Sequence, residues 1–180
     1  MTERKTEIIR HPKRRGEWAE SVFMARAAEH GLPVSTPRGD SDPFDFVVGE
    51  AGRFVAVQVK CTMAKSQSGA GYMCAVMHNN QTYRKGAFDF VAAYVIPEDA
   101  WYIVPATSIQ GRGALCLCSP HGKYEQYREA WQLLREATGC EELVNEPEPQ
   151  PSDESPVVER VRASFQFMRN HLEKGGRVRD

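Results

Sequence analysis

Two apolar segments joined by a short glycine-containing turn constrain the fold of this chain more than any other feature. The segments are FDFVVGE at Phe44–Glu50 and RFVAVQVK at Arg53–Lys60. Short runs rich in valine and phenylalanine are typical of β-strands, and the intervening Gly49–Gly52 has the residue types of a tight reversal. The sequence therefore predicts a β-hairpin.

The alternation of side chains along this hairpin separates an apolar face from a polar one. On the second strand, one face carries Val55, Val57 and Val59, and the other carries Ala56, Gln58 and Lys60. On the first strand, Asp45 lies on the face that Phe44, Phe46 and Val48 do not use, because successive residues of a strand point to opposite sides. A turn centred near residues 50–52 brings Asp45 opposite residues 56–58. We therefore expect a carboxylate, an amide and an ammonium group to converge on one face of the hairpin.

The rest of the chain predicts helices flanking one sheet. Helices are expected at residues 16–30, 124–137 and 157–174, and further strands at residues 72–77, 90–96, 101–105 and 114–118. Because hairpin-length turns join the central strands, the order predicts an α/β fold with a central mixed sheet flanked by helices, and not a doubly wound fold. The expected domains are a folded domain at 1–140, an acidic, proline-rich linker at 141–156, and a C-terminal helix and tail at 157–180.

The first predicted helix adds a second carboxylate. At 100° per residue, Glu20 lies on the side of the helix that also carries Gly16, Phe23, Met24 and Ala27, a side suited to packing on a sheet. Glu17 is the rival for the same role. It lies one turn earlier, where a carboxylate is also favourable simply because it faces the positive end of the helix dipole.

These residues resemble the motifs of the PD-(D/E)XK endonucleases, within the bacterial branch related to an intron-encoded homing endonuclease of cyanobacteria. The resemblance covers about residues 13–110 and is carried by KRRGEWAE (Lys13–Glu20), TPRGDSDPFDFVV (Thr36–Val48), VAVQVKCT (Val55–Thr62) and FDFVAAYVIPEDAWYIVP (Phe88–Pro105). It implies a restriction-endonuclease-like core, and the helix expected at residues 157–174 adds a C-terminal helical extension to that core. It also implies an active site made of Glu20, Asp45, Gln58 and Lys60. Gln58 stands where the wider superfamily usually has a glutamate.

Such a group of side chains suits a hard divalent cation. Mg²⁺, for which Mn²⁺ can substitute, prefers oxygen ligands, and these would come from Asp45, Gln58, Glu20 and the carbonyl of Val59. Lys60 would hold the attacking water and add positive charge beside the phosphate.

Basic residues around this site are expected to contact DNA, although each is also an ordinary residue of a solvated surface. They are Lys13, Arg14, Arg15, Lys65, Arg84 and Lys85. The formal net charge of −1 neither supports nor excludes an anionic partner, because the acids are concentrated far along the chain from the basic N-terminal stretch.

The sequence is compatible with three functions. The first is a Mg²⁺-dependent DNA endonuclease, which is expected to form a homo-oligomer because cutting both strands needs two sites. The second is an inactive nucleic-acid-binding module with the same fold, which Gln58 suggests. The third is a structure-specific nuclease of the Holliday-junction type. The five cysteines follow no disulfide or zinc spacing, and no apolar run approaches ~20 residues, so a cytoplasmic protein outside the membrane is expected.

Overall fold

The computed structural model describes residues 10–39, 42–78, 81–118 and 120–140. The predicted linker at 141–156 and the predicted helix and tail at 157–180 lie outside these residues. The helices are α2 (Pro12–Glu29) and α3 (Gln132–Thr138), with 3-10 turns at Ile96–Glu98, Ala106–Ser108 and Glu125–Tyr127. The strands are β1 (Val34–Ser35), β2 (Phe46–Glu50), β3 (Arg53–Thr62), β4 (Tyr72–Ala75), β5 (Met77–His78), β6 (Gln81–Thr82), β7 (Phe90–Val95), β8 (Ala100–Pro105) and β9 (Ala114–Leu117).

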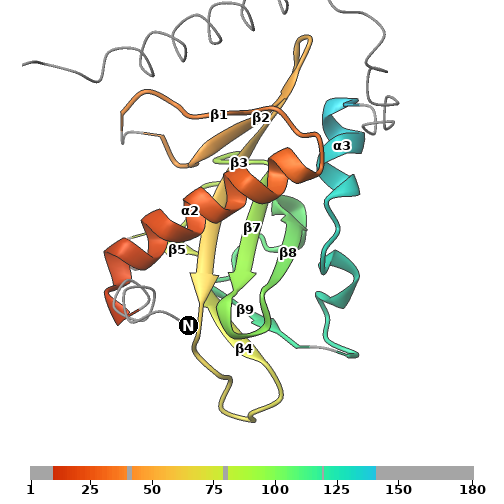
Figure 1. The fold of residues 1–180 in the computed structure, drawn as a ribbon. Coiled ribbons are helices and arrows are strands. Elements are labelled where there is room, and N and C mark those ends of the chain that lie inside the picture. The colour runs from red at the N-terminus through yellow and green to blue at the C-terminus, as the bar shows by residue number, and fades with distance from the viewer. Residues whose placement is uncertain (1–9, 40–41, 79–80, 119, 141–180) are drawn as a thin grey trace, which may run out of the picture. The chain divides into compact units, whose positions relative to one another are not determined.

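The predicted α/β fold with a central mixed sheet is confirmed. Five strands lie in the order β1-β2-β3-β7-β8, with β3 and β7 parallel and every other neighbouring pair antiparallel (Figure 1). Two small sheets, β4-β9 and β5-β6, accompany it. The segment at 114–118 was expected to be an edge strand, and β9 pairs with β4 alone among the strands described.

The predicted β-hairpin is formed by β2 and β3 and has the predicted register. Phe46 pairs with Val57 and Glu50 pairs with Arg53, so the turn consists of Ala51 and Gly52. Both turn residues have positive φ, 51° and 85°, which is the conformation that a two-residue turn needs to match the twist of its strands. The main-chain N–H of Asp45 donates to the Val57 carbonyl at 3.0 Å and continues the pairing beyond β2.

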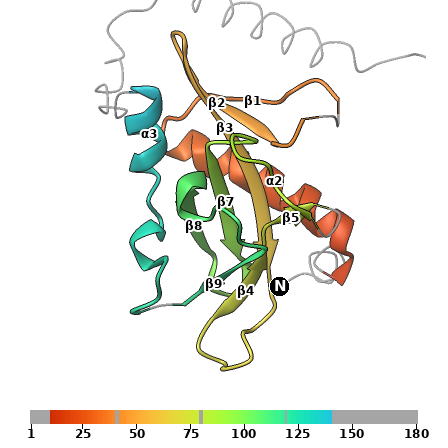
Figure 2. The same ribbon diagram turned by 180° about the vertical axis from the view of Figure 1, so that it is seen from behind.

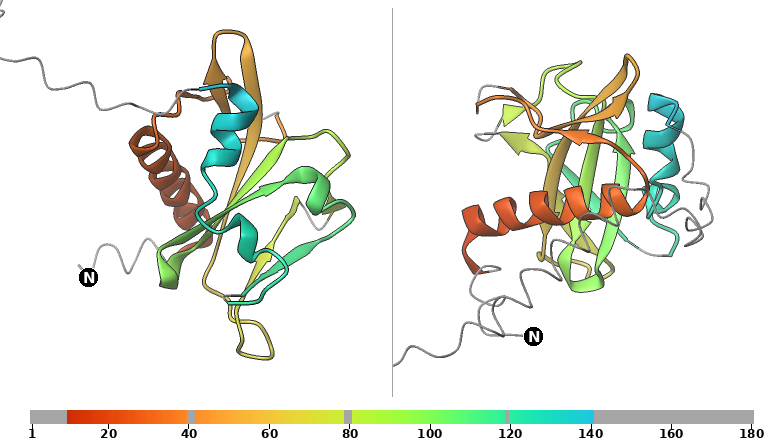
Figure 3. Two further views of the ribbon diagram at one scale, coloured as in Figure 1. Left: turned by 90° about the vertical axis from the view of Figure 1, so that its right-hand side faces the viewer. Right: turned by 45° about the horizontal axis from the view of Figure 1, so that its top comes forward.

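Helix α2 covers one face of the sheet and forms the first core there (Figures 1 and 3). Its buried residues Ala19, Phe23 and Ala27 face the sheet, and the Phe23 ring stacks on the Phe46 ring at 5.2 Å between centroids. The valines at 55, 57 and 59 belong to the same core, as predicted. Met24, expected on the packed side of the helix, is instead 40% exposed.

A second core lies on the opposite face of the sheet, the face that is turned toward the viewer in Figure 2. There β4 and β9 contribute Cys74, Leu115 and Leu117, which pack with residues of β7 and β8. All six residues of β7 are therefore buried, because both faces of the sheet at this strand are covered.

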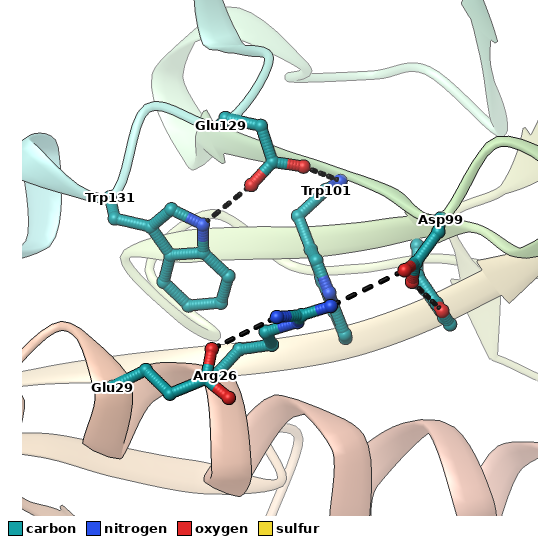
Figure 4. A network of polar contacts seen from close by, with 7 residues as sticks. Arg26, Glu29, Asp99, Trp101, Glu129 and Trp131 are labelled. Atoms are coloured by element: carbon teal, nitrogen blue, oxygen red, sulfur yellow. Dashed lines mark hydrogen bonds and ion pairs between the residues drawn. The ribbon is translucent and has the colours of Figure 1, made fainter.

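The single helix predicted over residues 124–137 is wrong. The 3-10 turn Glu125–Tyr127 is followed by a break before α3 begins at Gln132. In the break, Arg128 pairs with Tyr102 of β8, and Glu129 takes a positive φ of 51°. In that conformation the Glu129 carboxylate accepts two hydrogen bonds, from the Trp101 main-chain N–H at 2.7 Å and from Trp131 Nε1 at 2.9 Å (Figure 4). Hydrogen bonds to the sheet therefore replace those of a continuous helix.

A second polar connection, also in Figure 4, joins α2 to the turn between β7 and β8. Arg26 pairs with Glu29 at 2.9 Å on its own helix and with Asp99 at 3.3 Å, and Asp99 also accepts a hydrogen bond from the Tyr94 hydroxyl. Within the described residues no helix is long and apolar enough to cross a bilayer.

Candidate active site

The four residues expected to form the site line one cleft with a volume of about 1020 Å³. Glu20 comes from α2, Asp45 directly precedes β2, and Gln58 and Lys60 lie on β3. The remaining walls come from Lys13, from the segment Gln81–Ala87 and from the residues Thr36, Pro37, Gly39 and Asp42–Phe44. The hairpin thus supplies three of the four side chains, and the helix packed across it supplies the fourth.

Asp45 and Gln58 form the most buried part of this cleft. Asp45 Oδ2 accepts hydrogen bonds from the Val59 main-chain N–H, at 2.7 Å, and from the Gln58 side-chain amide. The same amide nitrogen donates to the Val59 carbonyl at 3.1 Å, and Gln58 is only 5% exposed. The backbone of Val59 on β3 therefore orients both the Asp45 carboxylate and the Gln58 side-chain amide.

Burial and neighbouring charge disfavour ionisation of both carboxyl groups. Desolvation raises the pKa of Asp45, and the Val59 N–H, Lys60 and the Gln58 amide oppose that rise without cancelling it. Desolvation also raises the pKa of Glu20, aided by the negative charges of Asp45 and Glu17 and opposed by Lys60. Two neighbouring carboxyl groups whose negative charges are disfavoured in the folded protein are typical of a functional site, and a bound cation would offset those charges.

Glu20 and Glu17 differ in where their side chains lie. Glu20 is half-buried and lines the cleft, whereas Glu17 is exposed and does not line it. Glu17 still acts on the site at a distance, because its charge is one of those that raise the pKa of Glu20.

The sequence did not predict the contact between Lys60 and Tyr83. The Lys60 ammonium lies 5.6 Å from the centre of the Tyr83 ring, within the range of a cation–π interaction. The Tyr83 ring in turn meets the Phe88 ring edge to face at 4.9 Å. Tyr83 therefore connects Lys60 to the second core, and no spacing in the sequence signals such a contact.

The expected DNA contacts divide into two groups. Lys13, Arg84 and Lys85 line the cleft. Arg14, Arg15 and Lys65 do not line it. Lys13, Arg14 and Arg15 lie in the first turn of α2, which begins at Pro12 and not at the predicted residue 16.

The donor atoms of the cleft fit a hard divalent cation. The described residues contain no cluster of three or more His, Cys, Asp or Glu side chains that would hold a metal by themselves. The cleft combines the two carboxylates with the Gln58 side-chain amide, and the carbonyl of the next residue, Val59, which does not itself line the cleft, accepts from that amide. Carboxylate, amide and carbonyl oxygens are donors of the kind that Mg²⁺ prefers. In this structure Asp45 Oδ1 and the Glu20 carboxylate accept no hydrogen bond from another described residue, so their lone pairs remain available.

Comparison with known proteins finds a matching family and similar solved structures. Residues 10–133 match the model of the PD-(D/E)XK endonuclease family. The solved structure of a bacterial homing endonuclease, I-Ssp6803I, is similar to this one, with a TM-score of 0.58 and 27% sequence identity over 67% of this chain and 90% of that chain. No curated protein matches. The resemblance inferred from the motifs is confirmed.

Proposed function

The chain belongs to the PD-(D/E)XK endonuclease family, and from this premise we propose that it is a metal-dependent DNA endonuclease that hydrolyses phosphodiester bonds in the cleft of Glu20, Asp45, Gln58 and Lys60. The observation that carries the proposal is the grouping in one cleft of two acids whose pKa values are raised and one lysine. The solved relative is a homing endonuclease, which agrees with DNA as the substrate.

Glu20, Asp45, the Gln58 amide oxygen and the Val59 carbonyl would hold the cation, which we propose to be Mg²⁺, with Mn²⁺ able to replace it. When bound, such a cation lowers the pKa of a coordinated water and offsets the charge that develops on the phosphate. Asp45 would be the firmest ligand, because the Val59 N–H and the Gln58 amide already fix its orientation.

Lys60 would act on the phosphate and on the attacking water. Its ammonium group donates hydrogen bonds, and its charge is held in the cleft beside the Tyr83 ring. Positive charge placed where negative charge develops lowers the barrier more than the same charge in bulk water does.

DNA would lie across the mouth of this cleft. Lys13, Arg84 and Lys85 would contact the phosphates nearest the site, and Arg14, Arg15 and Lys65 phosphates farther from it. Cutting both strands needs two sites, so we propose a homo-oligomer. We also propose a cytoplasmic location, consistent with the five free cysteines.

A plasmid-nicking assay tests the proposal. We expect the wild-type protein to nick supercoiled DNA with Mg²⁺ or Mn²⁺, and Lys60→Ala to lower the rate by about 100-fold or more while DNA binding on a gel persists. Lys123→Ala is the matched control. It removes the same group from a position over the Tyr124 ring, outside the cleft, and should leave the rate unchanged.

One observation favours the inactive binding module as a second candidate. The Gln58 amide nitrogen already satisfies both Asp45 Oδ2 and the Val59 carbonyl, so this part of the site is stable without a cation. A wild-type protein that shifts DNA on a gel yet nicks neither plasmid nor four-way junctions with either metal would establish that function. Cleavage of junctions alone would instead establish a structure-specific nuclease.

A further inference from the structure

A second cavity, of about 250 Å³, adjoins the active-site cleft. The segment Thr82–Gly86 lines both hollows and so forms the wall between them. The floor of the second cavity is apolar and consists of Val76, Phe88 and Ile109, whose exposed fractions are 2%, 6% and 6%. Such a floor suits a flat apolar group and offers nothing to a free phosphate.

The rim of this cavity is positively charged. Arg84, Lys85 and Arg112 line it, all three are exposed, and no aspartate or glutamate lies among the lining residues. Within the described part of the chain, none of the three forms an ion pair. The rim is therefore complementary to an anion held above the apolar floor.

We propose that this cavity receives one unpaired nucleotide of the DNA strand that lies in the cleft, with its base on the floor and its phosphate on the rim. The inference rests on the proposed nuclease function and names its substrate as DNA with an unpaired nucleotide next to the cleavage position. The size agrees, because an apolar cavity of about 150 Å³ holds benzene and a nucleobase is somewhat larger. Enzymes that extrude a base enclose it between aromatic and apolar side chains in this way.

Tyr83 connects the second cavity to the catalytic group. It lies in the shared wall, and its ring centre is 5.6 Å from the Lys60 ammonium and 4.9 Å from the ring centre of the floor residue Phe88. A nucleotide seated on Phe88 would therefore lie near the ring that contacts Lys60. Thr82 and Gln110 also line the cavity and provide polar groups for the edge of the base.

Fluorescence anisotropy in EDTA, where no cleavage occurs, tests the proposal. The probes are a short fluorescein-labelled duplex with one bulged thymidine and the same duplex fully paired. We expect the wild-type protein to bind the bulged duplex about tenfold more tightly, since stacking of one base supplies that much.

Two variants weaken the preference by different routes. Ala106→Met fills the cavity with a flexible side chain from its half-buried wall, and Arg112→Ala removes one charge of the rim. Ala106→Met should bring the ratio of the two affinities close to one, because it removes the seat of the base, and Arg112→Ala should lower the ratio, because it removes one of three rim charges. Lys123→Ala removes a charge outside the cavity and should keep the ratio. Melting curves establish that the variants fold, and Arg112 is exposed, so its replacement keeps the test valid if Ala106→Met does not fold.

Equal affinity of the wild-type protein for the two duplexes would overturn the inference, and so would an unchanged ratio in Arg112→Ala. If the protein nicks plasmid but does not prefer the bulged duplex, the nuclease function is supported and the proposed role of the cavity is contradicted. If the folded protein binds neither duplex, both proposals are contradicted.

Discussion

Gln58 donates its side-chain amide to the carboxylate of Asp45 across the β2–β3 hairpin, and the same nitrogen reaches the Val59 carbonyl at 3.1 Å. A glutamate at this position would have no donor for either acceptor. The glutamine therefore gives both acceptors a donor when no cation is bound. We therefore predict that the stability of the metal-free protein and its response to metal depend on the same residue.

Gln58→Glu should destabilise the metal-free protein and increase its response to metal. The substitution places a second carboxylate beside Asp45 in a position that is only 5% exposed, and it leaves the Val59 carbonyl without its donor. Loss of these bonds costs about 2 kcal/mol, or several degrees in Tm. Differential scanning fluorimetry in EDTA and in MgCl₂ measures both effects. A Tm in EDTA equal to that of the wild type would contradict this stabilising role of Gln58.

Asp45→Asn should leave the protein at least as stable as the wild type at neutral pH while abolishing cleavage and the Mg²⁺-induced rise in Tm. Burial raises the pKa of Asp45, so above that pKa the folded protein carries a charge that it disfavours. Asparagine removes the charge and keeps an oxygen for the Val59 N–H. The stability difference should disappear as the pH falls below the ordinary pKa of aspartate, where the carboxyl is protonated in both states. A large loss of stability at neutral pH would show that the carboxylate itself holds the hairpin.

Glu129→Ala should lower the free energy of unfolding by about 2–3 kcal/mol, because it deprives two buried tryptophans of a charged acceptor. Trp101 and Trp131 are each 1% exposed, and Glu129 binds the main-chain N–H of the first and the indole of the second. Urea denaturation followed by tryptophan fluorescence measures the loss. Glu136→Ala, an exposed position on α3, is the control and should stay near the wild-type value. Equal midpoints for the two variants would contradict the role of Glu129.

His30 should make the protein sensitive to mild acid. Burial lowers the pKa of His30 below its ordinary value of 6.5, aided by the charge of Arg135, and its ring stacks on Trp131 at 4.9 Å. Because the unfolded chain binds the proton more readily, this residue's contribution to stability is lost as the pH falls through the ordinary pKa toward the lowered one. The urea midpoint should fall between about pH 7.5 and about pH 5.5 in both proteins, and the fall should be larger in the wild type than in His30→Phe, which keeps the stacking. Equal falls in both proteins would contradict the prediction.

Much of the candidate site could be predicted from local sequence. Strand alternation has a period of two, and a two-residue turn leaves one register, so Asp45, Gln58 and Lys60 had to share a face once the hairpin was recognised. The mixed sheet followed in the same way from the lengths and order of the apolar segments. Helical phase alone does not determine the direction of Glu20, because Met24, on the same predicted packed side, is 40% exposed.

Only the tertiary structure decided the contacts between distant segments. Residues 124–137 have a helical pattern, yet the Trp101 N–H and the Trp131 indole draw Glu129 into a conformation that ends any helix there. Tyr83 meets Lys60, and Arg112 joins Arg84 and Lys85, through packing that no local spacing encodes. The sequence by itself determined which side chains the hairpin presents, because that depends on adjacent residues. What surrounds them, and so what the cleft and its neighbouring cavity can bind, depends on the free energy of packing segments far apart in the chain.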